Sequence, residues 1–135
     1  MWMRALSAPH WPGTVGAGAG IGGHVAKRFA REDYHAVLCR RSNKVGLDDL
    51  VAEIEAEGGS AEGHLLNAVE PDTIEDRIAA VEADVGPIEV VLFNLGAQIG
   101  AKMLSETTYK QFELGWRLAT FALFRMVRTV VPFME

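Results

Sequence analysis

The sequence has almost no cysteine and no long uncharged hydrophobic run, and each absence argues against a class of protein. Cys39 is the only cysteine among 135 residues, so the chain forms no internal disulfide and no cluster of thiol ligands. The most apolar stretch, residues 118–134, is interrupted by Arg125 and Arg128, which argues against a membrane span. The first residues lack the apolar run of a secretory signal peptide. We therefore expect a cytoplasmic protein.

The sequence also lacks an excess of positive charge and a cluster of metal ligands. It carries 13 lysine and arginine residues against 18 aspartate and glutamate residues, a formal net charge of −5. The basic residues are scattered and form no stripe, so we expect no nucleic-acid partner. The histidines show no metal-ligand spacing, and we expect no metal. They are His10, His24, His35 and His64.

What the sequence does have is the size and the patterning of one globular domain. Its 135 residues are enough to bury a sizeable core, and 49% of them are hydrophobic. From Val15 onward, strand-like and helix-like patterns alternate without a linker or an internal repeat. This alternation is typical of βαβ units, and it predicts an α/β fold with a parallel sheet.

Short apolar runs and amphipathic segments mark the expected elements. Strands are predicted at residues 36–39, 61–66 and 88–93, and the last of these is the most apolar. Helices are predicted over 21–33, from a cap at Ser42 or Asn43 to the glycines at 58 and 59, from Pro71 to Gly86, and from about Glu106 onward. Their expected apolar faces are Val25, Ala26, Phe29 and Ala30; Leu47, Leu50, Val51 and Ile54; Ile74, Ile78, Val81 and Val85; and Phe112, Trp116, Leu123, Val127 and Val130.

The segment before the first glycines fits this scheme least well. Prolines lie where a central strand needs backbone donors, so only Thr14 and Val15 are expected to pair regularly. Either the first strand is stunted, or the residues before about Thr14 are not the natural beginning of the domain. We predict an irregular segment over residues 1–13 and a dinucleotide-binding domain over residues 14–135.

The stretch Gly16-Ala17-Gly18-Ala19-Gly20-Ile21-Gly22 is the most informative in the chain. Glycine has no side chain, so it lets the backbone approach a phosphate closely. A helix is expected to begin here, and its first N–H groups favour an anion. The next strand ends roughly 20 residues further on, where dinucleotide-binding folds contact the ribose. The pattern predicts a nucleotide cradle.

This spacing resembles the short-chain dehydrogenase/reductase family, whose loop reads Thr-Gly-x-x-x-Gly-Ile-Gly. Val15 stands in place of the threonine. The matching residues are Gly16, Gly20, Ile21 and Gly22. Further landmarks follow in order, so the resemblance covers about residues 14–134. It implies a Rossmann-like, doubly wound parallel sheet in the strand order 3-2-1-4, and an NAD(P)-dependent oxidoreductase acting on an alcohol or a carbonyl.

Arg40 and Arg41, at the end of the second expected strand, bear on the choice of coenzyme. The family places there an acidic residue for the ribose diol or a basic residue for the 2′-phosphate of NADP. A guanidinium binds phosphate through charge-assisted hydrogen bonds, and no carboxylate competes at this position. The resemblance therefore favours NADP(H) over NAD(H).

Three further residues stand at coenzyme contacts of the family. Asn67 takes the place of an Asp that contacts adenine. Asn94 and Gly96 belong to Asn-Leu-Gly-Ala, where the family has Asn-Asn-Ala-Gly, so one amide and a flexible backbone are kept. Arg117 falls where the family has an Asn that helps to organise a catalytic lysine through water. The resemblance thus implies Asn67, Asn94 and Gly96 as coenzyme contacts.

The catalytic residues of the family, a Ser and a Tyr-x-x-x-Lys pair, have no match in this sequence. Tyr34 is followed four residues later by Leu38, and Tyr109 by Glu113. A positioned acid contributes about 10²–10⁴-fold to such a reaction. We therefore expect no catalytic residue here and little turnover by this chain alone, in an incomplete domain truncated after about four strands.

Several possibilities stay open at this point. The apolar stripe of the last expected helix fits either packing against the sheet or a subunit interface. The unpaired edge of residues 90–93 predicts poor solubility, or a homo- or hetero-oligomer that covers this edge and the last helix. The chain is the coenzyme-binding part of an oxidoreductase, a non-catalytic nucleotide-binding or interaction module, or a fragment without function.

Overall fold

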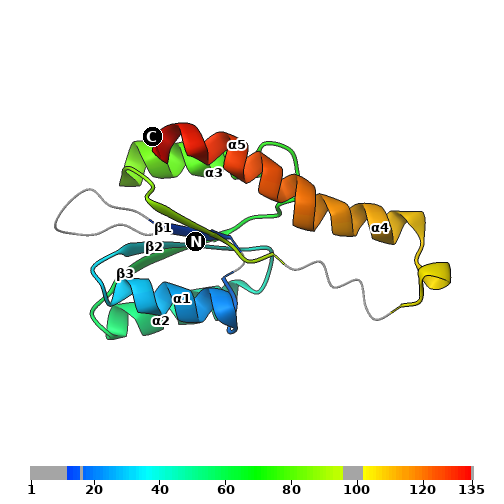
Figure 1. The fold of residues 1–135 in the computed structure, drawn as a ribbon. Helices are drawn as coiled ribbons and strands as arrows, with labels where there is room; N and C mark the ends of the chain where they lie inside the picture. The colour runs from blue at the N-terminus through cyan, green and yellow to red at the C-terminus, as the bar shows by residue number, and fades with distance from the viewer. Residues whose placement is uncertain (1–11, 16, 96–101, 135) are drawn as a thin grey trace.

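Strands alternate with helices along most of the chain, as Figure 1 shows. A computed structural model describes residues 12–15, 17–95 and 102–134. The strands are β1 (Pro12–Val15), β2 (His35–Arg40), β3 (Ser60–Leu65) and β4 (Val90–Phe93). The α-helices are α1 (Ile21–Ala30), α2 (Lys44–Ala56), α3 (Thr73–Ala80), α4 (Tyr109–Trp116) and α5 (Ala122–Met134). The short helical turns are Val81–Val85, Leu104–Glu106 and Arg117–Phe121.

The described strands form one parallel sheet in the order β3-β2-β1-β4, as the sequence predicts. β2 and β3 pair along their whole length, from His35 opposite Ser60 to Arg40 opposite Leu65. Because the strands are parallel, the carboxyl ends of β1, β2 and β3 lie at one edge of the sheet. Ligands of open α/β sheets bind outside that edge.

β1 is short, and its pairing differs on its two sides. Against β2, only Thr14 and Val15 are paired, as the prolines predict. Against β4 the pairing already begins at Pro12, which lies opposite Val90. A proline lacks only the N–H group, so a strand can begin with one. β1 therefore starts two residues before the predicted domain start at residue 14, and residues 1–11 lie outside the described part of the chain.

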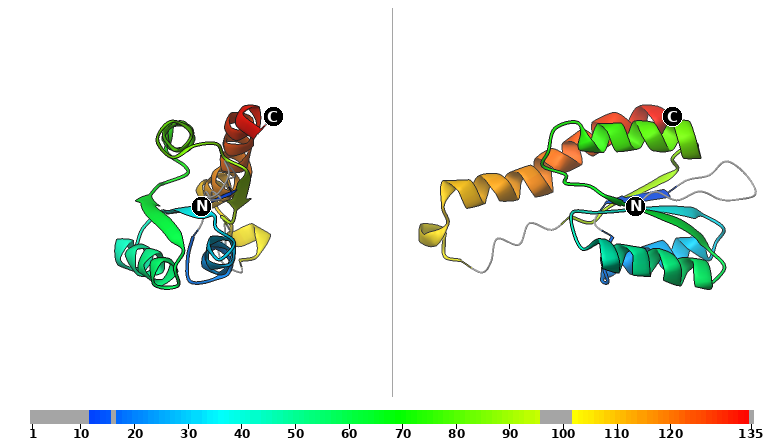
Figure 2. Two further views of the ribbon diagram at one scale, coloured as in Figure 1. Left: turned by 90° about the vertical axis from the view of Figure 1, so that its left-hand side faces the viewer. Right: turned by 180° about the vertical axis from the view of Figure 1, so that it is seen from behind.

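Helices cover both faces of the sheet (Figures 1 and 2). α1 and α2 lie on one face, and α3 and α5 lie on the other. Ala36 and Leu38 of β2 pack with α1 and α2, whereas Val37 and Cys39 pack with α3 and α5. All four side chains are fully buried. Successive side chains of a strand point to opposite faces, so a strand covered on both sides reads as a continuous apolar run.

The predicted apolar faces of the first three helices are confirmed. Their buried members are Ala26, Ala30, Leu47, Leu50, Ile54, Ile74, Ile78 and Val81. The other four members, Val25, Phe29, Val51 and Val85, are partly buried against the same clusters. Asn43 caps α2, because its side chain accepts a hydrogen bond of 2.9 Å from the N–H of Gly46.

Two predicted helix boundaries are wrong. α1 ends at Ala30 rather than at Asp33, and Asp33 has a left-handed backbone with a φ of 62°. α3 begins at Thr73 rather than at Pro71, because Asp72 is also left-handed, with a φ of 61°. An α-helix does not continue through such a residue.

The last helical region differs most from its prediction. Instead of one helix from about Glu106, a π-helical turn over Arg117–Phe121 separates α4 from α5. Of the five side chains expected on one apolar face, only Val130 is buried, and the other four are exposed. They are Phe112, Trp116, Leu123 and Val127. A π turn takes more residues than an α turn, so a spacing counted across it does not stay on one face.

α5 instead packs on α3 through a different set of residues. Ala122, Met126 and Val130 follow one another at intervals of four and are the buried residues of this helix. Beyond the sheet, α4 projects to one side (Figure 1). None of the helices in the described ranges is both long enough and apolar enough to cross a membrane.

Candidate functional site

The candidate site lies where β1, β2 and β3 end and α1 begins. The backbone N–H of Ala17 donates to the carbonyl of Cys39 at 3.0 Å, which ties the residue after the first glycine to β2. The N–H of Leu66 donates to the carbonyl of Arg40 at 2.9 Å, which ties the end of β3 to β2. These two bonds hold the glycine turn, Arg40 and the loop after β3 at one edge of the sheet.

The start of α1 presents bare backbone. Gly20 occupies the N-cap position, so no side chain caps the first N–H groups, and no acidic residue lies in the first turn. A Cβ atom at Gly20 would meet nothing within 4 Å, so the space in front of this residue is open. An uncapped helix N-terminus with open space before it favours an anion such as a phosphate. Gly22 is buried, Ile21 is exposed, and Gly16 lies outside the described residues.

The packing of this turn also requires a glycine at position 23. A Cβ atom at this position would lie 2.3 Å from the carbonyl oxygen of Gly18, a distance that real Cβ atoms do not show. The missing side chain therefore lets the first turn of α1 pack directly on the glycine turn. Sequence reasoning assigned no role to Gly23 in the family pattern, because the contact is visible only in three dimensions.

Arg40 lies between two clefts. The first, of about 280 Å³, is lined by Ala17, Gly18, Arg40, Arg41, Ser42, Leu66 and Leu95. The second, of about 350 Å³, runs between α1 and α2 and is lined by Gly18, His24, Arg40 and Asn43, among others. Among the described residues, neither Arg40 nor Arg41 has an ion-pair partner, whereas five other cations each pair with a carboxylate. Lys27, which also lines the second cleft, is paired with Glu53.

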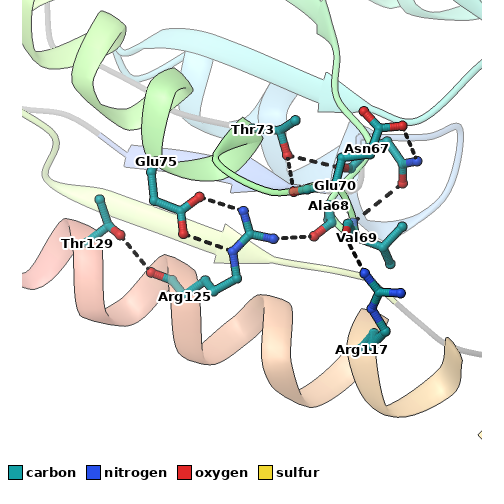
Figure 3. A network of polar contacts seen from close by, with 9 residues as sticks. All are labelled: Asn67, Ala68, Val69, Glu70, Thr73, Glu75, Arg117, Arg125 and Thr129. Carbon is teal, nitrogen blue, oxygen red and sulfur yellow. Dashed lines mark hydrogen bonds and ion pairs between the residues drawn. The ribbon is translucent and has the colours of Figure 1, made fainter. Parts of the chain in front are cut away.

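The loop after β3 holds Asn67 by its side chain. The amide nitrogen of Asn67 donates to the Glu70 carboxylate at 2.9 Å, and its amide oxygen lies 3.5 Å from the N–H of Val69. The Thr73 hydroxyl donates to the Asn67 carbonyl at 2.9 Å and to the Glu70 carbonyl at 3.1 Å (Figure 3). Asn67 is half-buried and directly follows Leu66, a residue of the first cleft.

Two arginines from the last helical region hold the backbone of the same loop. Arg117 donates to the Val69 carbonyl at 3.0 Å, and Arg125 donates to the Ala68 carbonyl at 2.9 Å (Figure 3). Arg125 also binds the Glu75 carboxylate through two hydrogen bonds of 2.8 and 2.5 Å. The hydrogen bonds of this pair lower the pKa of Glu75 and raise that of Arg125, while burial opposes both shifts.

Sequence reasoning placed Arg117 where the family has an Asn that helps to organise a catalytic lysine, and it gave Arg125 no role in the site. In the structure both side chains bind the β3–α3 loop. The sequence did contain an indication that Arg125 has a partner. A charged residue inside a strongly apolar helix is rarely unpaired when it is buried. Its partner was not visible, since it lies 50 residues away in the sequence.

The remaining expected contact follows β4. Asn94 is half-buried and comes directly after the strand, and the next residue, Leu95, lines the first cleft. Gly96 lies outside the described residues. The structure therefore gathers Gly20, Arg40, Asn67 and Asn94 at the carboxyl edge of the sheet. Across the described residues, no three His, Cys, Asp or Glu side chains are grouped to hold a metal ion.

Comparison with known proteins identifies relatives of this chain. A model of the short chain dehydrogenase family matches residues 14–135. Gluconate 5-dehydrogenase of Gluconobacter oxydans is 39% identical over 84 residues, which are 62% of this chain and 32% of that protein. Fatty acyl-CoA reductase of Acinetobacter baylyi is 29% identical over 121 residues, 89% of this chain and 41% of that protein. The chain thus spans less than half the length of these curated relatives.

Solved structures show the same likeness. The match with a short-chain dehydrogenase from Rhodopseudomonas palustris covers 90% of this chain and 56% of that chain, with a TM-score of 0.83 and 36% identity. A metagenomic short-chain oxidoreductase in complex with NADP matches 91% of this chain and 55% of its own, with a TM-score of 0.84 and 26% identity. The arrangement of strands and helices is therefore that of a Rossmann-like sheet.

Proposed function

The chain belongs to the short chain dehydrogenase family, and we propose from this premise that it forms the NADP(H)-binding part of an oxidoreductase acting on an alcohol or a carbonyl. The observation that carries the proposal is Arg40. It ends β2, lines both clefts, and has no carboxylate partner in the described chain. A guanidinium in this position matches the 2′-phosphate that distinguishes NADP from NAD.

The residues of the site fit such a coenzyme along its length. We assign Gly16, Gly20, Ile21 and Gly22 to the diphosphate, because the bare start of α1 offers N–H groups to an anion. We assign Arg40 and Arg41 to the 2′-phosphate, and Asn67 to the adenine. We assign Asn94 and Gly96 to the part of the coenzyme beyond the diphosphate. When bound, the coenzyme supplies or accepts a hydride.

We further propose that these 135 residues bind the coenzyme without turning over a substrate. Neither Tyr34 nor Tyr109 is followed by a lysine at the fourth position. Carbonyl reduction needs a proton delivered as the hydride arrives, and this chain offers no positioned acid of the kind that the family uses. The alternatives, a non-catalytic nucleotide-binding or interaction module and a fragment without function, predict different binding behaviour.

Calorimetric titration of the purified, folded chain with NADPH and with NADH tests the proposal. We expect saturable binding of NADPH that is weakened about 10–100-fold in Arg40→Met, with little change for NADH. Arg28→Met is the matched control, since Arg28 lies on the exposed side of α1 and pairs with Glu32. The absence of NADPH binding by the folded chain would overturn the coenzyme assignment and leave the interaction module or the inert fragment.

We also propose a homo- or hetero-oligomer that covers α4–α5 and the open edge of β4. Trp116, Phe121 and Phe124 stack in succession, with ring centroids 5.3 and 6.5 Å apart, and all three are exposed. Tyr109 is 97% exposed. Exposed apolar surface of this kind marks interaction sites. Separately, we propose the cytoplasmic location that the single cysteine, the charges in residues 118–134 and the first residues of the sequence led us to expect.

Light scattering after size-exclusion chromatography measures this association. We expect more than one chain per particle, and a shift toward the monomer in Trp116→Ser combined with Phe124→Ser. Val45→Ser, at another exposed apolar residue on α2, is the control. A monodisperse monomer of the unaltered chain would contradict the homo-oligomer and leave only association with a different protein.

A further inference from the structure

We propose that Glu70 determines which nucleobase the site accepts, because it fixes the orientation of the Asn67 amide. This inference rests on the proposed coenzyme site and adds a positioning residue to it. An asparagine amide carries an N–H donor at one end and an oxygen acceptor at the other, in nearly the same shape. A free amide can therefore turn either way and pair with either a 6-amino or a 6-oxo purine.

The contact with Glu70 removes this ambiguity. The amide nitrogen of Asn67 lies 2.9 Å from Oε1 of Glu70. An ionised carboxylate only accepts hydrogen bonds, so the nitrogen must face Glu70 and the oxygen must face away. The intraloop partner of that oxygen, the N–H of Val69, is 3.5 Å away, at the limit of a hydrogen bond. The oxygen thus keeps most of its capacity to accept a further donor.

The loop backbone is held by groups other than the Glu70 side chain. Arg117 and Arg125 bind the carbonyls of Val69 and Ala68. The Asn67 carbonyl accepts from the N–H of Glu70 at 3.0 Å and from the hydroxyl of Thr73 at 2.9 Å. Figure 3 shows Arg117 and Arg125 reaching the loop backbone from the last helical region, whereas the Glu70 carboxylate contacts the Asn67 side chain. A change of the Glu70 side chain therefore alters the amide and leaves the main chain in place.

An amide oxygen that faces away from Glu70 and has only a weak partner in the loop selects a base that donates a hydrogen bond to it. Adenine has an exocyclic amine at its 6-position and donates a hydrogen bond, whereas hypoxanthine and guanine have an oxygen there. With a 6-oxo base, the Asn67 amide oxygen and the oxygen of the base would face each other, and neither could donate a hydrogen bond. The loss of this hydrogen bond disfavours the 6-oxo base. The site is thus expected to prefer a 6-aminopurine dinucleotide by about tenfold, a moderate ratio because Asn67 is only half-buried.

The test compares the affinities of the full chain for NADPH and for its hypoxanthine analogue, measured by fluorescence titration. The ratio is the readout, since a change in fold stability or in local charge alters both affinities alike. In Glu70→Gln, the glutamine amide can pair with Asn67 in either orientation, and we expect the ratio to fall close to one. In Asn67→Asp combined with Glu70→Gln, a carboxylate faces the base and only accepts, so the ratio is expected to return.

Asp72→Asn is the matched control. Asp72 is an exposed acidic residue two positions away, with no side-chain hydrogen bond at the start of α3, and its replacement removes the same charge. We expect its ratio to equal that of the unaltered chain. A Glu70→Gln ratio that stays unchanged would overturn the inference and leave the coenzyme site standing. Equal affinities in the unaltered chain would overturn it as well, whereas no binding of NADPH would reject the coenzyme site and the inference together.

Discussion

The two ends of the candidate site are organised in opposite ways. At the glycine turn, the first N–H groups of α1 have no side-chain cap, and Arg40 has no ion-pair partner within the described chain. At the β3–α3 loop, Arg117, Arg125 and Thr73 bind backbone carbonyls, and Glu70 binds the Asn67 side chain. The proposed phosphate end thus lacks protein groups that would neutralise it, while the proposed base end is already held by hydrogen bonds within the protein.

The largest effect is expected where the glycine turn meets α1. In Gly23→Val, the new side chain collides with the Gly18 carbonyl, from which its Cβ would lie only 2.3 Å away. We expect the free energy of unfolding to fall by about 2–3 kcal/mol and NADPH binding to be lost. Urea unfolding and calorimetric titration measure the two effects.

Gly18→Ala is the control for this change, because a Cβ atom at Gly18 would meet nothing within 4 Å. We expect its unfolding midpoint to stay close to that of the unaltered chain. Equal stability of the two variants would show that the close packing of α1 on the turn does not matter.

A smaller effect is expected at the base end. Arg125→Met removes two hydrogen bonds to Glu75 and one to the Ala68 carbonyl, and it leaves a partly buried carboxylate without its partner. We expect a loss of about 2 kcal/mol in the free energy of unfolding, measured in urea. Arg128→Met, on the exposed side of the same helix, is expected to change stability little. A comparable loss in both variants would contradict the assigned role of Arg125.

The same ion pair predicts how stability depends on pH. The hydrogen bond from Arg125 lowers the pKa of Glu75 in the folded chain below its ordinary value of 4.5. A carboxylate with a lowered pKa contributes its stability above the unfolded-state pKa and loses it as the pH falls through the folded-state pKa. We expect the stability difference between the unaltered chain and Arg125→Met to be full at neutral pH and to shrink below about pH 4. Urea unfolding of both proteins from neutral pH to below pH 4 measures this stability difference. A difference that grows as the pH falls would contradict the stabilising role of the Arg125–Glu75 ion pair.

The smallest effect concerns the cap that lies beside Arg40. Asn43→Ala removes the side-chain bond to the Gly46 N–H and places an alanine at a left-handed φ of 62°. We expect a loss of about 1 kcal/mol, measured by thermal or urea unfolding. Asn43→Gly keeps the left-handed backbone and loses only the side-chain bond. Its free energy of unfolding should therefore lie between those of the unaltered chain and Asn43→Ala. An Asn43→Gly variant that is less stable than Asn43→Ala would show that the backbone conformation is not the main cost.

The sequence was sufficient to predict the parallel sheet and the first three helical faces. Both depend on local periodicity, such as the continuous apolar run of Ala36 to Cys39, which is buried on both sides. The strand order followed from the family resemblance and not from this periodicity. The glycine turn and the two arginines at the end of β2 were singled out for the same reason, since their residues are adjacent in the sequence. Features that are local in sequence are the ones that pattern reasoning reaches.

The rest depended on contacts between distant segments. Arg117 and Arg125 bind a loop 48 and 57 residues earlier, and nothing in their own neighbourhood indicates that partner. The π turn over Arg117–Phe121 interrupts the α-helical spacing of the last helical region, so the side chains predicted to share one apolar face are mostly exposed. The requirement for Gly23 arises from a carbonyl five residues earlier, at a distance that only the folded turn fixes.

The central claim, that Arg40 makes the phosphate end selective for a 2′-phosphate, is tested most directly with half of the coenzyme. The affinities for adenosine 2′,5′-bisphosphate and adenosine 5′-monophosphate are measured by calorimetry on the folded chain and on Arg40→Met. We predict a preference for the bisphosphate of about tenfold or more in the unaltered chain, which largely disappears in the variant. Equal affinities for the two nucleotides in the unaltered chain would contradict the claim.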